Sequence, residues 1–322
     1  MGQYRPDLGT ELAVSRTVTT GDMVRATLRG KRFRPGDYLV QGLLFATLLI
    51  ALAVLVILIA DVVDRAAPVL RDRAGDFVTS NTSALASRAG IKQGIVGSLE
   101  LMLFVIVVAF PLGIGAAIYL EEYARDTRFT RFLQTNIRNL AGVPSIVYGL
   151  LGLAIFAQAL SGLTGGYSLL SGGLTLAILV LPIVIITASE ALRAVPQSIR
   201  EAGYGVGATR WEVVRSHVIP SAAPGIFTGT VLTLARALGE TAPLLLVGAV
   251  TGFFSAGSAG FAQQIRTDHG YTSMPTLIFS WATKPQSDFR ALTAAAIVIL
   301  LVVLLTVNAT AILLRNRYER KW

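Results

Sequence analysis

The sequence of 322 residues contains no cysteine, so disulfide bridges and thiolate metal sites are excluded. It has only two histidines, His217 and His269, which lie far apart and outside any H-E-x-x-H pattern. A glycine-rich phosphate-binding loop of the form G-x-x-x-x-G-K-[ST] is also absent. We therefore expect that the chain itself binds no metal, ATP or other cofactor.

Charged residues are scarce as well. They make up 15% of the chain against 53% hydrophobic residues, and the mean hydropathy is +0.63. This composition is too apolar for an ordinary soluble domain of this length. The net charge of +9 does not indicate nucleic acid binding, because the basic residues stand at the edges of apolar stretches, as in membrane proteins. We expect the lipid bilayer, and no nucleic acid, as a partner.

Six stretches are apolar and about as long as the roughly 20 residues that a helix needs to cross a bilayer. They are residues 38–60, 93–120, 137–160, 172–190, 222–250 and 291–314. Lysine and arginine gather in both terminal tails and in the connections after the second and fourth stretches. The connection 61–92 fits less well, since its five basic residues are accompanied by four aspartates. By the positive-inside rule, both termini are cytoplasmic.

The sequence thus predicts an all-α, multi-pass membrane protein with six transmembrane helices. Residues 1–36 would form a cytoplasmic tail, and residues 37–92 the first transmembrane helix and an external loop. The core would occupy residues 93–315, including two short cytoplasmic helices within residues 197–220. Residues 316–322 would form a second cytoplasmic tail.

The connection after the fourth stretch carries two helix-start signals. In a capping box, a hydroxyl and a carboxylate three residues later reciprocally satisfy free backbone N–H groups. Ser198 with Glu201 matches this pattern, and so does Thr209 with Glu212. Pro196 should break the preceding helix, because proline has no N–H to donate. The pattern predicts two consecutive short helices.

Two glycines and a second proline complete the connection. Gly205 and Gly207 would supply the sharp turn between the helices, and Pro220 would close the second helix. A rigid pair of helices on the cytoplasmic face indicates a docking surface for a partner. The alternative is a well-capped loop that binds nothing.

Two charged residues, Arg236 and Glu240, stand near the middle of the fifth stretch. A charge at the centre of a membrane helix costs roughly 2.5–3.5 kcal/mol on insertion scales, and the i, i+4 spacing allows these two to pair. The planar guanidinium fork suits phosphate oxygens. We therefore expect both to border a translocation path, with Thr241 and Ser145 as additional hydroxyl contacts. The alternative is an ion pair that locks two helices together.

The charged connection resembles the EAA motif of ABC importer permeases. Four residues match the motif at its usual spacing, namely Glu201, Ala202, Gly207 and Pro220. Gly203 replaces the third small residue of the motif, and His217 stands where isoleucine is usual. Residues 116–123, 142–149 and 235–243 resemble the phosphate permeases, in particular PstA-type subunits. The resemblance covers about residues 90–315.

This resemblance implies a type I ABC importer (MetI-like) permease fold in the cytoplasmic membrane of a bacterium. It implies a homologous PstC-like permease, two PstB-like ATP-binding subunits and an external PstS-like phosphate-binding protein as partners, with phosphate as cargo. ATP and Mg²⁺ would be bound by the partner ATPase, so the chain itself would not be an enzyme. The residues expected to couple to that ATPase are Glu201, Ala202, Gly203, Gly207, Thr209, Arg210, Glu212 and Pro220.

Three other functions are weighed against this one. The same assembly could carry another oxyanion, such as sulfate or molybdate, with differences in the third and fifth stretches. A secondary transporter or channel working alone would need no docking surface and should show two equivalent hydropathy halves, which are not evident. An intramembrane enzyme is disfavoured, since no motif of proteolysis or metal ligation is present.

Overall fold

The computed structural model describes residues 35–249 and 270–318, in a chain that divides into two units, residues 1–59 and 60–322. Helix α2, Pro35–Asp72, begins in the first unit, where its apolar run matches the first predicted transmembrane helix. Its last turns belong to the second unit, so the first part of the predicted external loop is helical. The predicted tail 1–36 lies almost wholly outside the described residues.

The regular elements among the described residues of the second unit are all helices, without a β-strand. Up to the middle of the chain its helices are α3 Ala74–Thr79, α4 Lys92–Ile118, α5 Arg128–Ala141, α6 Ser145–Gly152, α7 Ser161–Thr164 and α8 Leu169–Arg193. After them come α9 Gln197–Gly205, α10 Arg210–Val213, α11 Ile219–Gly239, α12 Ala242–Leu246, α14 Met274–Ala282 and α15 Asp288–Tyr318. The part of the chain that the structure describes also contains three π-helical turns, at Tyr119–Tyr123, Leu153–Ala159 and Val214–Val218.

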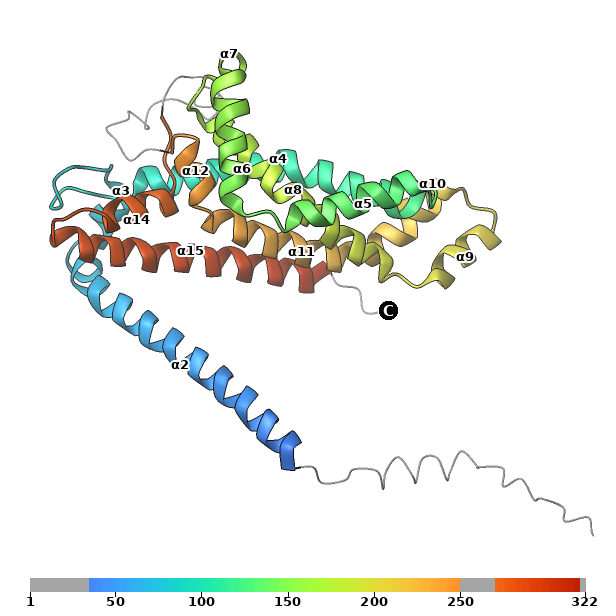
Figure 1. The fold of residues 1–322 in the computed structure, drawn as a ribbon, viewed down its shortest axis with the longest axis horizontal. Coiled ribbons are helices and arrows are strands. Elements are labelled where there is room, and N and C mark those ends of the chain that lie inside the picture. The colour runs from blue at the N-terminus through green and yellow to red at the C-terminus, as the bar shows by residue number, and fades with distance from the viewer. Residues whose placement is uncertain (1–34, 250–269, 319–322) are drawn as a thin grey trace, which may run out of the picture. The chain divides into compact units, whose positions relative to one another are not determined.

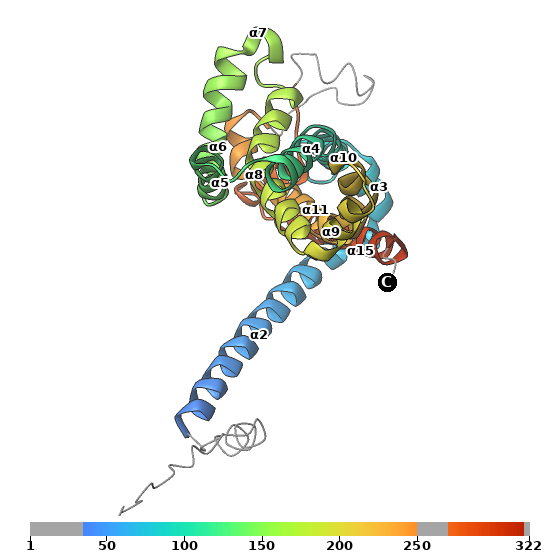
Figure 2. The ribbon, with the colours of Figure 1, turned by 90° about the vertical axis from the view of Figure 1, so that its right-hand side faces the viewer.

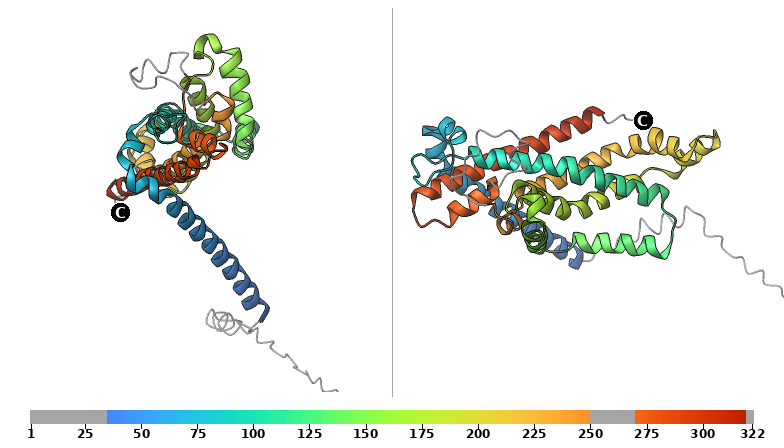
Figure 3. Two further views of the ribbon diagram at one scale, coloured as in Figure 1. Left: turned by 90° about the vertical axis from the view of Figure 1, so that its left-hand side faces the viewer. Right: turned by 90° about the horizontal axis from the view of Figure 1, so that it is seen from above.

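Helices α4, α8, α11 and α15 run side by side, as Figures 1 and 3 show. Helix α8 packs against both α4 and α11, and α11 packs against α15. Buried apolar side chains fill the space between them, among them Val105, Val180 and Leu234. Figure 2 shows the bundle close to end-on. Within the described residues, five helices are long and apolar enough to cross a membrane, or six if one bent pair counts as a span.

The bent pair corrects the third predicted span. Residues 137–160 do not form one helix, because α5 and α6 meet at an angle of 99°. The break lies between Ala141 and Ser145, where Pro144 stands. Proline lacks an N–H donor and disfavours the α conformation in the residue before it. By contrast, Pro111 and Pro182 lie inside the continuous helices α4 and α8.

The fifth predicted span, residues 222–250, is also interrupted. Helix α11 ends at Gly239, and Glu240 has an extended backbone before the short helix α12 begins. At its other end, α11 continues from α10 through the π-helical turn Val214–Val218. Pro220 therefore does not close the second short helix. The widened turn directly before this proline accommodates a residue that cannot donate a backbone hydrogen bond.

The segment that leads into α14 lies against small residues of α4. An added Cβ at Gly97 would stand 1.9 Å from the carbonyl oxygen of Thr272. Next to it, the backbone N–H of Met274 donates a buried hydrogen bond of 2.8 Å to the hydroxyl of Ser98. Close backbone approach and this hydrogen bond fix the start of α14 on α4.

We predict that Gly97→Ala lowers the thermal stability of the detergent-solubilised protein, because the new methyl group overlaps a backbone oxygen and not a flexible side chain. Overpacking of this kind costs about 1–3 kcal/mol. The matched control is Gly115→Ala on the same helix, where nothing lies within 4 Å of the added carbon. The melting temperature would be measured as the temperature at which heating removes the monodisperse peak in size-exclusion chromatography. Equal melting temperatures for the two variants would contradict the packing described here.

Candidate functional site

The two short helices α9 and α10 lie together at one end of the second unit, and α14 lies at the opposite end (Figures 1 and 3). Helix α9 begins at Gln197, directly after Pro196, and no side chain caps it. Ser198 is therefore inside the first turn, and the predicted Ser198–Glu201 capping box is wrong. Proline sets a helical φ and lacks an N–H, so the helix starts immediately after it.

The second predicted capping box is present at the start of α10. The backbone N–H of Thr209 donates to Glu212 Oε2 at 2.7 Å, and the backbone N–H of Glu212 donates to Thr209 Oγ1 at 3.4 Å. The guanidinium of Arg210 lies over the ring of Tyr123, 5.3 Å from its centroid. Residues before and inside α10 thus define where this helix starts and hold it against the end of α4.

Two glycines shape the turn and the contact between the short helices. Gly207 has φ +83°, a backbone conformation that side-chain-bearing residues rarely adopt, and nothing lies within 4 Å of an added Cβ. Gly203 is buried, and an added Cβ there would stand 2.7 Å from Val213 Cγ2. Gly207 is therefore required by the turn, and Gly203 by the close packing of α9 on α10.

The outer surface of the α9–α10 pair is solvent-exposed and mixed in character. Glu201 and Ala202 are exposed, and Glu201 makes no ion pair within the described residues. Large apolar side chains are exposed beside them, namely Tyr204, Val206 and Trp211, with Val206 at 85%. Exposed aromatic and apolar side chains next to charges are typical of surfaces that bind another protein.

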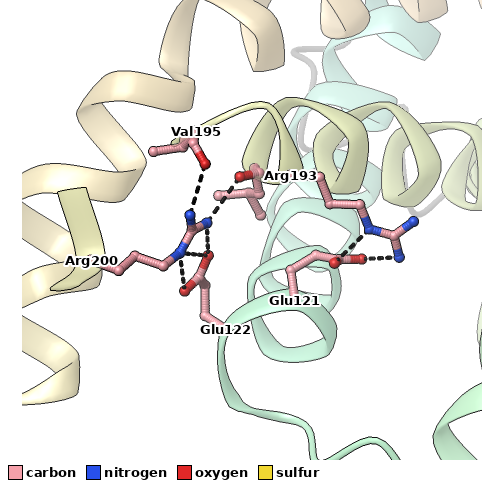
Figure 4. A network of polar contacts seen from close by, with 6 residues as sticks. Glu121, Glu122, Arg193, Val195 and Arg200 are labelled. Atoms are coloured by element: carbon pink, nitrogen blue, oxygen red, sulfur yellow. Dashed lines mark hydrogen bonds and ion pairs between the residues drawn. The ribbon is translucent and has the colours of Figure 1, made fainter. Parts of the chain in front are cut away.

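Behind this surface lie two ion pairs that the charge pattern alone did not predict (Figure 4). Arg193 donates two hydrogen bonds of 2.7 Å to Glu121, and Arg200 of α9 pairs with Glu122 at 2.6 Å. Both glutamates belong to the π-helical turn Tyr119–Tyr123 that follows α4. A polar hollow of about 570 Å³ is lined by all four side chains. The only sequence signal is a pair of adjacent acids at the end of an apolar stretch.

The ion pair expected from the spacing of Arg236 and Glu240 is present, with 3.5 Å between Arg236 Nε and Glu240 Oε1. Arg236 lies in the last turn of α11, and Glu240 is the residue that caps this helix. Both stand at a helix end, not in the middle of a continuous span. The side chain of Glu240 is 15% exposed and that of Arg236 is 53% exposed, so part of the guanidinium remains accessible.

The two hydroxyl residues predicted for the path also lie at helix breaks. Thr241 precedes α12, and Ser145 is the first residue of α6. Helices α6 and α12 pack closely, since an added Cβ at Gly149 would stand 2.6 Å from Pro243 Cα. The two breaks thus belong to neighbouring elements. No hydrogen bond joins Ser145 to the other three path residues within the part of the chain that the structure describes.

Comparison with known proteins gives close sequence relatives. Over 245 residues, the chain is 33% identical to the phosphate transport system permease protein PstA of Xylella fastidiosa (strain Temecula1 / ATCC 700964), covering 75% of this chain and 81% of that protein. It is 34% identical to phosphate transport system permease protein PstA 1 of Mycobacterium tuberculosis (strain CDC 1551 / Oshkosh), covering 70% of each. The probable ABC transporter permease protein YqgI of Bacillus subtilis (strain 168) is 36% identical over 176 aligned residues. The aligned residues make up 54% of this chain and 58% of that relative's length.

Solved structures with the same fold include a subunit of a bacterial alginate ABC transporter in complex with an alginate pentasaccharide-bound periplasmic protein. Superposition on this subunit gives a TM-score of 0.63 at 15% sequence identity, and the match covers 86% of this chain and 93% of that subunit. A subunit of the inward-facing MetNI methionine ABC transporter gives 0.56 at 16% identity, covering 71% and 98%. The fold is therefore that of type I ABC importer permeases. Residues 109–320 match the model of one protein family, and the chain belongs to it: the binding-protein-dependent transport system inner membrane components.

Proposed function

We propose that this chain is a transmembrane permease subunit of an ATP-driven importer of inorganic phosphate. It would cross the bacterial cytoplasmic membrane several times with both termini in the cytoplasm, which places α9 and α10 on the cytoplasmic side. ATP and Mg²⁺ would be bound by a separate subunit, and this chain would convert the movement of that subunit into alternating access of a path for phosphate.

The observation that carries the proposal is the exposed, rigid α9–α10 pair. Its turn is fixed by Gly207, its second helix is capped by Thr209 and Glu212, and its apolar side chains are uncovered. Such a surface is preorganised, so little conformational entropy would be lost when a partner binds. The exposed carboxylate of Glu201, which forms no ion pair with the described residues, is available for a cation of that partner. We assign the coupling role to the predicted set Glu201, Ala202, Gly203, Gly207, Thr209, Arg210, Glu212 and Pro220.

Relatives and charge both support phosphate as the cargo. Two of the relatives above are phosphate transport system permease proteins. In addition, Arg236 offers a partly exposed guanidinium that Glu240 holds from one side, and such a fork suits phosphate oxygens. Interrupted helices at this site are typical of transport paths, because irregular backbone in a membrane protein is tolerated where it lines a cavity. Thr241 and Ser145 would contribute hydroxyl groups. Sulfate or molybdate is the second candidate cargo.

The proposed assembly contains this chain, a homologous permease, two ATP-binding subunits and an external phosphate-binding protein. The test is reconstitution of this set in vesicles. We expect uptake of radiolabelled phosphate that requires ATP on the α9–α10 side and the binding protein on the other side. Excess unlabelled phosphate should suppress the signal, whereas equal sulfate or molybdate should not. Uptake by this chain alone, without ATP or companions, would contradict the proposal.

We predict that Gly207→Val abolishes phosphate uptake while the protein remains in the membrane. A left-handed backbone costs a residue with a Cβ about 1–2 kcal/mol, and a branched side chain makes the strain larger. The matched control is Gly205→Val, because Gly205 lies in α9 without a positive φ and with nothing within 4 Å of its added Cβ. The measurements are uptake in whole cells and the amount of ATP-binding subunit that co-purifies. Normal uptake by Gly207→Val would show that the turn does not matter.

We predict that Arg236→Ala lowers phosphate uptake at least about tenfold, equivalent to about 1.4 kcal/mol in the rate-limiting barrier, with the assembled complex recovered in normal amount. The reason is that the guanidinium would contact the cargo and is not needed to join two helices. Arg65→Ala is the control, since Arg65 and Asp61 form an exposed i, i+4 pair of the same kind. A collapse of assembly in Arg236→Ala would instead assign the pair a purely structural role.

A further inference from the structure

The end of α4 is joined to α9 by a buried ion pair between residues that are 78 positions apart in the sequence. Arg200 Nη2 donates to Glu122 Oε1 at 2.6 Å, and Arg200 Nε lies 3.2 and 3.3 Å from the two carboxylate oxygens. The side chains are only 13% and 4% exposed. A charge pair held this far from water has strict geometry, because moving either partner leaves the other buried and unpaired.

The same guanidinium also binds the chain that connects α8 to α9. Arg200 Nη1 donates to the carbonyl oxygen of Val195 at 2.9 Å, and Nη2 donates to that of Leu192 at 3.0 Å (Figure 4). The Arg200 side chain of α9 therefore forms hydrogen bonds with three segments: the π-helical turn after α4, the last turn of α8 and the residues before Pro196. Lysine could not replace it, because only the planar fork reaches a carboxylate and two carbonyls together.

Helix α10 meets the same π-helical turn through Arg210, whose guanidinium lies over the ring of Tyr123. Both short helices thus contact the turn Tyr119–Tyr123, although neither is next to α4 in the sequence. Covalent continuity already joins α9 to α8 and α10 to α11. Without the contacts to this turn, α4 would have no direct polar connection to the docking surface through the side chains described here.

We propose that Arg200 and Glu122 are positioning residues that make α4 follow the movement of α9, so that three membrane helices respond to the partner ATPase together. This inference rests on the proposed function. A partner that displaces the exposed face of α9 would carry Arg200 with it, and the buried pair would draw the end of α4 along. Loss of the pair would leave the end of α4 joined to α8 and to Arg210 but no longer to α9 through a buried ion pair. The movement of α9 would then reach α4 incompletely, and ATP would be hydrolysed without complete transport.

The test compares this pair with its neighbour. Glu122→Gln and Arg200→Gln remove one charge each from the proposed connection to α9. Glu121→Gln and Arg193→Gln are matched controls, because that pair has the same chemistry on the same turn but joins it to α8 and not to α9. Each variant is reconstituted with its companions, and phosphate transported per ATP hydrolysed is measured together with the yield of complex.

We expect the ratio of phosphate to ATP to fall at least about five-fold in Glu122→Gln and Arg200→Gln, the lower end of ordinary coupling between two sites. The controls should keep the ratio within about twofold of the unmodified complex. A merely structural role would lower the yield, the hydrolysis and the transport in proportion and leave the ratio unchanged. That result, or an equal fall in the control pair, would overturn the proposal.

A second variant covers the case in which a single substitution prevents assembly. The chain has no cysteine of its own, so Glu122→Cys with Arg200→Cys introduces the only two thiols in it. A reducible bifunctional thiol reagent should restore the ratio when it bridges them, and reduction should remove the effect. No restoration by the bridge in an assembled complex would also overturn the proposal. If the unmodified complex neither transports phosphate nor hydrolyses ATP, the proposed function fails instead.

Discussion

A chain that crosses a bilayer must satisfy its backbone hydrogen bonds within itself, and the arrangement of the long helices depends on that constraint. It makes α4, α8, α11 and α15 long and regular. It also makes each interruption costly, and two of the breaks lie where polar residues stand. Arg236, Glu240 and Thr241 surround the end of α11, and Ser145 opens α6 after the 99° bend. At these two breaks, irregular backbone and polar side chains occur together.

Outside the apolar region the constraint is relaxed, and the chain uses side chains to give short helices a defined shape. Helices of nine and four residues, such as α9 and α10, are too short to be stable in isolation. Here they are stabilised by a cap at Thr209, by close packing at Gly203 and by the ion pair of Arg200 with Glu122. Tyr204, Val206 and Trp211 are exposed on the outer face, so they are available for binding.

Sequence reasoning succeeded where a feature depends on neighbours in the chain. Helical class follows from composition, and the Thr209–Glu212 cap, the turn at Gly207 and the pairing of Arg236 with Glu240 follow from residue type or from spacings of four residues or fewer. Two of the six predicted spans, the third and the fifth, are interrupted. Sequence reasoning failed where two local signals compete. Pro196 was predicted to end one helix and Ser198 to cap the next, but α9 begins directly after Pro196, so Ser198 lies inside the helix. Similarly, Pro144 breaks a helix whereas Pro111 does not, and the difference depends on packing that one sequence does not reveal.

Sequence reasoning did not predict the contacts between distant segments. Glu122 and Arg200 are 78 residues apart, and nothing in either neighbourhood specifies the other. The arginine was explained by the charge bias of cytoplasmic connections, which is satisfied equally well by an arginine that points into water. Burial of both side chains distinguishes the two cases, and burial is a property of the folded chain. The roles assigned to the coupling and path residues remain proposals for the same reason, since they concern partners and cargo.

The π-helical turn Val214–Val218 has a consequence for how the two ends of this helix are oriented. Such a turn inserts one residue relative to the regular α pattern, and one residue corresponds to a rotation of about 100° around the helix axis. The angular phase of α10 is therefore offset from that of α11. Side chains on α10 and side chains on α11 therefore face different directions around the helix axis. The face of α10 and the face of α11 that packs on neighbouring membrane helices can thus change independently in evolution.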